Sequence, residues 1–321
     1  MGRSVSIVLI TFNSARYLPA CFEGISRQTH REVDVVAIDN ASLDASAEAV
    51  RRLAPDARLI ANGTNRGFAA AANQGIRESR GELVLLLNPD VSLQPAYLER
   101  LIDAMAEPKI GAATGKLLRG AGESIAPTTT VDSKGIRMTR SGRHFDIDNG
   151  HEDAADSDST REVFGVSGAA ALYRRAFLQD VAVGGEIFDE SFFAYREDAD
   201  LAWRGRLFGW KAIYVPRAIA YHVRRVTPEA RRSLPPEINF HSVKNRFLLR
   251  LKNEGGLLAL WNAPFELARD LIVLGATMTV ERSSFGAWKW LWQHRREILT
   301  KREEIQRRRV VGDREIAKWF P

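Results

Sequence analysis

The sequence predicts an α/β fold in which helices cover both faces of a mostly parallel central sheet. Two observations lead to this prediction: short, fully apolar runs alternate with segments of helical periodicity, and polar residues follow directly where the apolar runs end. Strands that are apolar on both sides are typical of a parallel sheet buried between two layers of helices. From about residue 239 onward the pattern is mainly helical, which predicts a helical extension at the carboxyl end.

The first ninety residues supply the strands and helices of this sheet in regular order. The pattern predicts strands at 5–11, 33–38, 58–61 and 83–87, with helices that end near 27 and span 45–53 and about 68–78. In such sheets, ligands bind beyond the carboxyl ends of the strands. Polar residues follow three of these strands and are expected to contact a ligand: Thr11, Asn13, Asp39, Asn40, Asn88 and Asp90.

Two later segments set the expected domain boundaries. Between about 120 and 161 the apolar periodicity lapses into Gly, Thr, Ser and acidic residues, which predicts a long polar loop, either a lid or a solvated insertion. Pro235 and Pro236 indicate a second boundary. We therefore expect a main domain at 1–230, made of halves 1–115 and 116–230, and a helical region at 231–321.

Composition narrows the class of protein further. With 321 residues, 45% of them apolar, the chain is long enough to bury a globular core. The single cysteine, Cys21, lies in a helical pattern of apolar residues and is interpreted as a buried hydrophobe, not a nucleophile. No charged and apolar leader precedes the first strand, so a cytoplasmic protein is expected.

The first strand-to-helix junction argues against two classes of nucleotide-binding enzyme. A dinucleotide-binding dehydrogenase would have Gly-x-Gly-x-x-Gly here, whereas this chain has Thr-Phe-Asn-Ser-Ala at 11–15. The sequence also contains no Gly-x-x-x-x-Gly-Lys-Ser/Thr segment. Nicotinamide-dependent oxidoreductases and P-loop ATPases are therefore disfavoured.

Three polar residues at predicted strand ends could contact a ligand or a metal. Asp39 either caps the following helix or contacts a ligand, and its segment alone leaves both interpretations open. Asp90, in Asn88-Pro89-Asp90, is either part of an ordinary turn or a rigid carboxylate for a hard divalent cation that bridges phosphate oxygens. His222 is a lone histidine near a sheet edge, more often a satisfied residue than a ligand, but as a neutral imidazole it could complete a metal site with Asp90.

The segment 192–204 is the richest in candidate catalytic groups. Glu197, Asp198 and Asp200 stand among bulky aromatic residues at a predicted helix start. The helix dipole favours acids in a first turn, which explains one or two of them without any function. Aromatic neighbours partly desolvate a carboxylate and raise its proton affinity, which suits a general base. Asp198 and Asp200 point to different sides of a helix, so one of the two is expected to be structural.

Taken together, these segments resemble family 2 of the inverting glycosyltransferases, which have the GT-A fold with a Rossmann-like sheet, and within it the rhamnosyltransferase-like bacterial branch. The matching residues cover nearly the whole chain in order: Val8 to Asn13, Asp39 to Asp44, Asn65 to Phe68, Asn73, Asn88 to Asp90, Ser167 to Ala169, Phe192 to Arg204, Pro216 to Ala218, His222 and Lys244 to Arg246. A match of this extent is far more specific than any single motif.

The resemblance implies a donor site and a catalytic pair. It implies that 1–115 binds a nucleotide sugar, 116–230 binds the acceptor, and Asp39 contacts the base or the ribose. Asp198, beside Glu197, corresponds to the acid that deprotonates the acceptor hydroxyl in a single displacement with inversion. The implied contacts with the nucleotide sugar are Thr11, Asn13, Asp39, Asn65, Gly67, Asn73, Asn88, Gly168, Trp203 and Arg204.

The resemblance further implies a divalent cation, Mg²⁺ or Mn²⁺, on the diphosphate of the donor. The family usually has Asp-x-Asp where this chain has Asn88 and Asp90, so the expected ligands are Asp90 and His222. Such a cation would stabilise the charge that develops on the departing nucleotide diphosphate. The implied reaction moves a sugar, with rhamnose from dTDP-rhamnose as a candidate, to a saccharide or lipid-linked acceptor in polysaccharide biosynthesis.

The sequence does not decide what the basic carboxyl-terminal region contacts. Residues 257–280 are apolar, but a proline and three charged residues interrupt them, so a spanning helix is not expected. The Trp-rich run at 288–292 and the later arginines could lie in a membrane interface, which would make the protein peripheral to the inner face of a membrane. The alternative is a set of helices that packs on the main domain or on a second copy in a homodimer. Nucleic acid is not expected, because no reading module is recognisable.

Two other functions remain open from the sequence. A module of this fold that had lost catalysis would bind a nucleotide sugar without turning it over, although Asp39, Asp90 and Asp198 are all present. A nucleotidyltransferase is disfavoured because no Gly- and Lys-rich phosphate-binding segment follows the first strand. Release of pyrophosphate instead of a nucleotide diphosphate would identify it.

Overall fold

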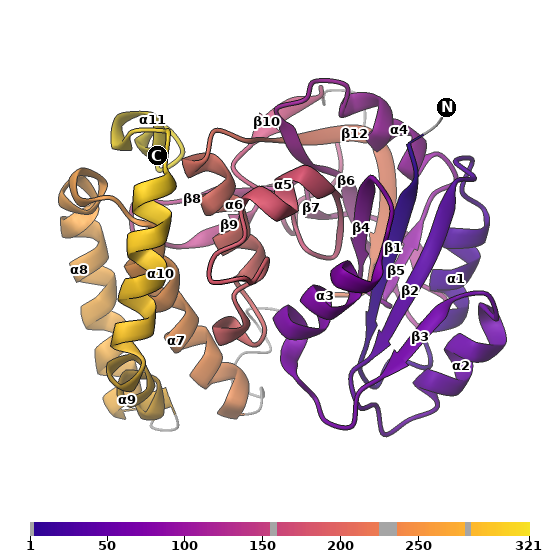
Figure 1. The fold of residues 1–321 in the computed structure, drawn as a ribbon, viewed down its shortest axis with the longest axis horizontal. Coiled ribbons are helices and arrows are strands. Elements are labelled where there is room, and N and C mark those ends of the chain that lie inside the picture. Colours follow the sequence, from indigo (N-terminus) through magenta and orange to yellow (C-terminus); the bar gives the residue numbers. More distant parts are fainter. Residues whose placement is uncertain (1–2, 155–158, 225–235, 280–283) are drawn as a thin grey trace.

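A computed structural model describes residues 3–154, 159–224, 236–279 and 284–321 of the chain (Figure 1). A twisted sheet flanked by helices forms one part, and the helices of the carboxyl end stand beside it (Figure 1). The predicted α/β class with a helical extension is confirmed. Among the described residues, no helix is both long and apolar enough to cross a bilayer.

In the described residues, ten strands form the central sheet, in the order β10-β12-β6-β11-β4-β1-β2-β3, with β5 paired to β12 and β7 to β6. Their bounds are Val5–Thr11 (β1), Val33–Asp39 (β2), Arg58–Ala61 (β3), Leu83–Leu87 (β4), Val91–Leu93 (β5), Ile110–Ala121 (β6), Ala126–Ser133 (β7), Arg161–Val163 (β10), Ala170–Arg174 (β11) and Lys211–His222 (β12). Strands β4, β1, β2 and β3 are parallel, whereas β11 is antiparallel to both β4 and β6. The sheet is thus parallel in its first half, as predicted, and mixed in its second.

Alternate residues of the central strands enter two separate cores, one on each face of the sheet. Val8 and Leu86 share a core with α3 (Gly67–Glu78), whereas Ile7 and Leu85 share the other with α1 (Leu18–Ser26), α2 (Ser46–Leu53) and α4 (Tyr97–Ala104). Cys21 is buried in this second core, and burial raises the pKa of its thiol far above the usual range. The thiol is therefore a packed apolar group, as the sequence predicts.

The segment 120–161 corrects the sequence prediction of a long loop. β6 and β7 extend into it, and β8 (Ile136–Met138) forms a hairpin with β9 (His144–Asp146), while 155–158 lie outside the described residues. The first five residues of β7 are exposed or half-buried, and only its last three are buried. Strands of this kind carry polar residues and lack the continuous apolar pattern that marks a central strand, which is why composition concealed them.

The helical extension packs on the second half of the sheet domain. It consists of α7 (Pro236–Asn253), α8 (Gly256–Thr279), α9 (Phe285–Gln293), α10 (Arg295–Arg308) and α11 (Asp313–Ala317). Helix α7 contacts α6 (Glu197–Leu207) and η1 (Glu190–Phe192) on one side and α9 and α10 on the other. At the carboxyl end, the Phe320 ring lies 4.9 Å from the Trp203 ring of α6. The boundary predicted at 230 and 231 falls outside the described residues.

Candidate functional site

A cavity of about 640 Å³ opens where β1, β2 and β4 end. Its walls also include the start of α3, the segment 167–169, the segment 193–198 and the first turns of α7. Eight of the residues implied by the sequence line this cavity together: Asn65, Gly67, Asn88, Asp90, Gly168, Glu197, Asp198 and His222. Residues far apart in the chain are thus gathered at the sheet edge where α/β folds bind ligands.

Thr11, Asn13 and Asp39 support the rim of the cavity and do not line it. Thr11 and Asp39 are paired across β1 and β2, and both are buried. Asn13 Oδ1 accepts a hydrogen bond from the Leu43 N–H at 2.7 Å, and Asp39 Oδ2 accepts one from the Ser42 N–H at 3.2 Å. Asp39 Oδ1 is buried and has no hydrogen-bond partner among the described residues. Asp39 therefore fixes its own turn and retains one carboxylate oxygen that a nucleotide could satisfy.

Asn40, directly after β2, connects the strand ends to the loop before α3. Its Nδ2 donates to Asn65 Oδ1 at 2.8 Å and to the Gly67 carbonyl at 3.1 Å, while its Oδ1 accepts from the Arg66 N–H. Gly67 has φ of +81°, and a Cβ there would lie 2.6 Å from the Phe193 carbonyl oxygen. Only glycine tolerates both conditions, so Gly67 lets the start of α3 touch the loop before α6 at the cavity wall.

Asp90 and His222 lie together on one wall of the cavity. Asp90 Oδ1 is 3.5 Å from His222 Nε2, because β5, which follows Asp90, pairs with the end of β12. The other ring nitrogen, Nδ1, lies 2.8 Å from Asp132 Oδ2 on β7, and Arg224 Nε donates to Asp132 Oδ1 at 2.6 Å. Burial opposes a charge on His222, but the carboxylates of Asp132 and Asp90 outweigh it and raise the pKa of the imidazole to about 10.

The chemistry of these residues fits a cation that binds mainly through the substrate. Among the described residues, no group of three or more His, Cys, Asp or Glu side chains is arranged to hold a metal. Asp90 Oδ1 is nevertheless buried without a hydrogen-bond partner in the described part of the chain. Mg²⁺ needs only one or two protein ligands when phosphates and water complete its shell. A carboxylate on the far ring nitrogen of His222 is the arrangement that orients metal-bound imidazoles.

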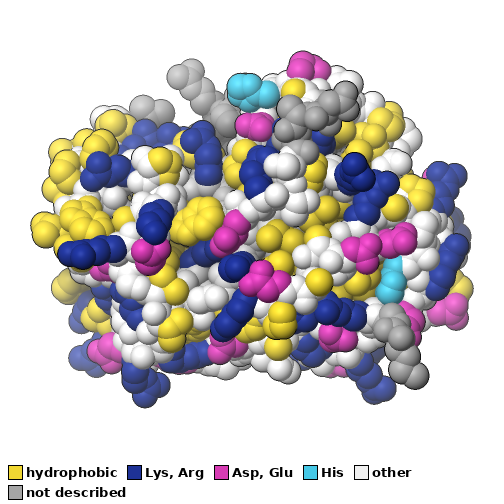
Figure 2. Space-filling view, turned by 90° about the horizontal axis from the view of Figure 1, so that it is seen from above, with side chains coloured by type: hydrophobic (Ala, Val, Ile, Leu, Met, Phe, Trp, Pro, Cys, Tyr) yellow, Lys and Arg dark blue, Asp and Glu magenta, His cyan; other side chains and the backbone are white. Residues whose placement is uncertain are grey.

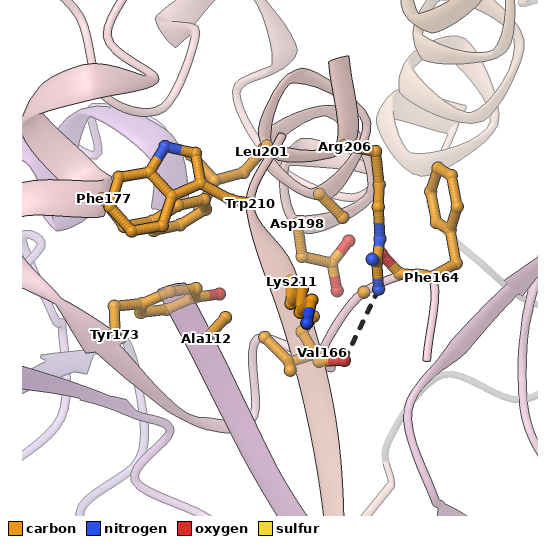
Figure 3. Close-up of a pocket in the computed structure, with 14 residues that line it drawn as sticks. Ala112, Phe164, Val166, Tyr173, Phe177, Asp198, Leu201, Arg206, Trp210 and Lys211 are labelled. Carbon is orange, nitrogen blue, oxygen red and sulfur yellow. Dashed lines mark hydrogen bonds between the residues drawn. The ribbon is translucent and has the colours of Figure 1, made fainter. Parts of the chain in front are cut away.

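Asp198 also lines the cavity, in the first turn of α6. Its Oδ2 accepts a hydrogen bond from the Gly168 N–H at 3.2 Å, and its Oδ1 accepts one from the Ala199 N–H at 2.8 Å. Behind it, Asp198 borders a small, mainly apolar pocket whose lining includes Phe177 and Leu201 (Figure 3). Burial raises the pKa of Asp198, and the two backbone N–H groups oppose that rise in part. The carboxyl is therefore a stronger base than an exposed aspartate.

Glu197 is the second acid of the pair and is also buried. Its Oε2 has no hydrogen-bond partner among the residues that the structure describes. Burial and the negative charge of the adjacent Asp198 raise the pKa of Glu197. Two neighbouring carboxyls of raised pKa beside a cavity are typical of an acid–base site.

The loop before α6 holds a strained backbone that the helical extension clamps. The backbone φ angles of Phe193, Tyr195 and Arg196 are 63°, 69° and 71°, in a region that residues other than glycine rarely adopt. Buried Asn245 of α7 donates from Nδ2 to three carbonyl oxygens of this loop at 2.8–3.0 Å. Arg196 directly precedes Glu197 and Asp198, so α7 holds the loop that leads into the first turn of α6.

Three residues implied by the resemblance lie away from the cavity and are corrected here. Trp203 is fully buried between Phe164 and Phe320, and Asn73 bonds the backbone of Phe188. Arg204 Nε donates to Asp200 Oδ2 at 3.0 Å inside the protein. For Trp203 and Arg204 the helical period explains why they lie away from the cavity. They follow Asp198 by five and six positions, so their side chains point into the core and not, as that of Asp198 does, toward the cavity.

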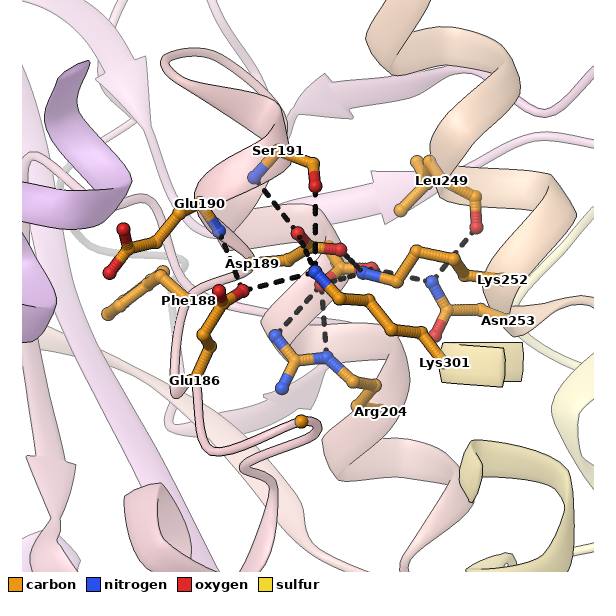
Figure 4. A network of polar contacts seen from close by, with 12 residues as sticks. Glu186, Phe188, Asp189, Glu190, Ser191, Arg204, Leu249, Lys252, Asn253 and Lys301 are labelled. Atoms are coloured by element: carbon orange, nitrogen blue, oxygen red, sulfur yellow. Dashed lines mark hydrogen bonds and ion pairs between the residues drawn. The ribbon is translucent and has the colours of Figure 1, made fainter. Parts of the chain in front are cut away.

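Asp200 belongs to a buried ionic network that joins the sheet domain to the extension (Figure 4). Lys252 Nζ of α7 contacts both Asp200 oxygens at 3.0 and 3.1 Å and also pairs with Asp189. Lys301 of α10 donates to Asp189 Oδ1 at 2.8 Å. Of the two aspartates that the sequence left to be distinguished, Asp200 has the structural partners and Asp198 faces the cavity.

Sequence reasoning did not single out Asp132 or assign a role to Asn245. Asp132 lies in the segment predicted as a loop, and its contact with His222 joins residues 90 positions apart. Asn245 stands in the matching motif at 244–246, which was the available signal, but its contact with the loop before α6 also spans about 50 residues. Long-range pairs of this kind leave no local pattern in a single sequence.

Comparison with known proteins gives a consistent result. The model of the family described as glycosyl transferase family 2 matches residues 6–182. An N-acetylglucosaminyl-diphospho-decaprenol L-rhamnosyltransferase of Mycobacterium tuberculosis is 31% identical over 238 residues, which cover 67% of this chain and 75% of that protein. A poly-beta-1,6-N-acetyl-D-glucosamine synthase of Staphylococcus epidermidis is 24% identical and covers 68% of this chain, but only 49% of its own length is matched.

Solved structures share the fold. The protein GalNAc-T7, crystallised with UDP, GalNAc and Mn²⁺, superimposes with a TM-score of 0.62 at 14% identity, over 78% of this chain and 48% of that one. A mannosyltransferase from Pyrobaculum calidifontis, in complex with GDP-Man and Mn²⁺, gives a TM-score of 0.54 at 20% identity, over 95% of this chain and 85% of that one. At these identities the likeness concerns the architecture alone.

Proposed function

The chain belongs to glycosyltransferase family 2, and from that premise we propose an inverting transfer of a sugar from a nucleotide diphosphate to a hydroxyl of a lipid-linked saccharide. Rhamnose from dTDP-rhamnose is the first candidate donor, because the Mycobacterium tuberculosis relative is named as an L-rhamnosyltransferase. That relative's name also specifies an N-acetylglucosaminyl-diphospho-lipid as its acceptor. An acceptor of that chemical class is the corresponding proposal for this chain.

One observation carries the mechanistic part: Asp198 and the Asp90–His222 pair line the same cavity. In the proposed reaction, Asp198 accepts the proton of the acceptor hydroxyl as its oxygen attacks the reacting carbon of the donor sugar. The bond from that carbon to the phosphate oxygen breaks on the opposite side, and the nucleotide diphosphate departs with the bonding electrons. A single displacement of this kind inverts the anomeric configuration.

The donor side of the cavity supplies positioning. Asp39 and the hydrogen bonds of Asn40 hold the turns that we expect to contact the nucleoside. Asn88 lies two residues before Asp90, where we expect the diphosphate to bind. Asp90 and neutral His222 would hold a divalent cation, while Asp132 keeps the imidazole oriented. When bound, such a cation supplies electrostatic stabilisation of the leaving diphosphate. The carboxylates of Asp90 and Asp132 flank the imidazole, at 3.5 and 2.8 Å from its two nitrogens.

Donor binding is tested first by thermal shift. The correct nucleotide sugar with Mn²⁺ should raise the unfolding temperature, since a ligand at about a hundred times its Kd adds about 2.7 kcal/mol to stability. Asp39→Ala should abolish the shift and keep the fold. Turnover is then measured as release of nucleotide diphosphate. Binding without release from any donor would contradict the proposed transfer, and release of pyrophosphate would indicate a nucleotidyltransferase.

Replacement of Asp90 should weaken the response to metal. For Asp90→Asn, we expect the Mn²⁺ concentration that gives half-maximal nucleotide diphosphate release to rise about 10- to 100-fold, because a neutral amide is a poorer ligand for a hard cation. The matched control is Asp56→Asn, which changes an exposed carboxylate of the same type. An unchanged metal requirement in Asp90→Asn would remove Asp90 from the metal site.

A further inference from the structure

Helix α8 places its polar residues inward and its apolar residues outward, the reverse of an ordinary surface helix. Its buried positions include Asn262, Glu266 and Thr277. Large apolar side chains are exposed along its whole length: Leu257, Leu260, Trp261, Phe265, Leu267, Leu271, Ile272, Leu274 and Met278. Leu267 and Leu271 are 63% and 68% exposed, respectively. A soluble surface helix normally has the opposite orientation.

The three charged side chains of α8 are turned toward the protein. Arg250 of α7 pairs with Glu266 at 3.2 Å and with Asp270 at 2.6 Å, and Arg269 is half-buried. The exposed residues of α8 therefore include no charged one. This arrangement explains how a segment whose sequence is interrupted by charges still exposes apolar side chains along its length, and we call these exposed side chains the α8 face.

Helix α8 lies on the outer side of the extension, away from the sheet (Figure 1). Seen from above, hydrophobic side chains gather at the same end of the molecule, with Lys and Arg side chains among them (Figure 2). Helix α9 lies near the lower end of α8 in Figure 1 and continues the pattern, with exposed Phe285 and Trp292 beside exposed Lys289. Arg295 and Arg296 follow and are exposed.

We propose that the α8 face docks on the surface of an anionic lipid bilayer, with its apolar side chains in the interface and the cations of α9 and α10 toward lipid headgroups. Helices of this composition lie in the plane of the interface, where aromatic residues and Lys or Arg favour anionic lipid. The inference rests on the proposed function in one respect. A lipid-linked acceptor resides in a membrane, so a docked enzyme meets it at the bilayer surface.

Charge favours a bilayer over a second copy of the chain as the occupant of this face. A second copy docked through α8 would present the same face, which exposes no acidic side chain on α8 to pair with Lys289, Arg295 or Arg296. Such a partner offers these cations no counter-charge from α8, whereas an anionic bilayer neutralises them. Because α8 exposes no charged side chain, two copies would also have no ion pairs between their α8 helices to fix how these helices align.

Vesicle co-sedimentation of the full chain tests the proposal. The wild-type protein should sediment with vesicles of phosphatidylglycerol and phosphatidylethanolamine, and less with phosphatidylcholine alone. The double variant Leu267→Glu/Leu271→Glu should lower the partition coefficient at least about tenfold, because two charges would enter the interface. The matched control is Leu43→Glu/Val310→Glu, which adds the same charges at positions 94% and 76% exposed outside α8, α9 and α10. This control should bind like the wild type.

Two further measurements separate the possible outcomes. Sedimentation velocity without lipid would overturn the proposal if the wild type is a dimer, the α8 variant is a monomer, and neither binds vesicles. Equal vesicle binding by wild type and α8 variant would also overturn it. Transfer to a water-soluble acceptor without a lipid chain should be the same in both proteins, which supports docking as the affected step. Failure of that transfer in the wild type, with vesicle binding intact, would count against the proposed function and not against docking.

Discussion

Asp198→Asn is expected to lower kcat/KM for sugar transfer by about 10³-fold, within the range that a positioned general base contributes. The amide is nearly isosteric and can keep the contact with Gly168, but it cannot accept the proton of the acceptor hydroxyl. Donor binding should persist, because the substitution leaves Asp39, Asn40 and the Asp90–His222 pair, where we propose that the donor binds, unchanged. The measurement is steady-state release of nucleotide diphosphate together with the thermal shift produced by the donor.

The pH dependence gives an independent readout of the same carboxyl. Asp198 acts as a base only when it is deprotonated, so activity should rise with pH through its pKa. Because burial raises that pKa, the acidic limb should lie above about 3.9, the value of an ordinary aspartate. Asp103→Asn, at an exposed aspartate, should retain both rate and profile. A wild-type rate retained in Asp198→Asn would assign the base elsewhere, with Glu197 next to be tested.

Lys252→Met is expected to lower the free energy of unfolding by about 3–5 kcal/mol, the range found when one member of a buried ion pair is removed. Lys252 is fully buried and pairs with Asp189 and Asp200 (Figure 4). Methionine fills a similar volume but removes one buried cation from each aspartate, leaving Lys301 for Asp189 and Arg204 for Asp200. Urea unfolding followed by tryptophan fluorescence, with linear extrapolation, measures the change.

Lys318→Met provides the matched control for this stability change. Lys318 pairs with Glu315 at 2.6 Å, but the two side chains are 68% and 62% exposed. A solvent-exposed pair contributes at most about 1 kcal/mol, so the control should unfold nearly like the wild type. A similar small effect for Lys252→Met would mean that the network in Figure 4 is not needed for stability.

The central fold was predictable because buried parallel strands have a strong local signal. The strands predicted at 5–11, 58–61 and 83–87 agree with β1, β3 and β4 at both ends, and the predicted helices differ from those observed by one or a few residues. The second half was harder to predict. β7, β8 and β9 are short, partly exposed strands whose polar residues resemble those of a loop.

The sequence predicted which residues form the candidate site better than it predicted how they are arranged. The resemblance brought Asp90, His222 and Asp198 to one site, and all three line the same cavity. It also included Trp203 and Arg204, which the helical period turns into the core. Adjacent positions in a motif can serve different purposes, and only the direction of each side chain separates ligand contact from packing.

By itself, the sequence determined the class of enzyme, the parallel half of the sheet and the acids that carry the proposed chemistry. These depend on local periodicity and on motifs, which are properties of neighbouring residues. The tertiary structure decided which aspartate faces the cavity, that Asp132 contacts His222, and that α7 holds the loop before Glu197 and Asp198. It also decided that the charges of α8 turn inward. Each of these depends on contacts between segments distant in the chain, and packing of the whole molecule sets such contacts.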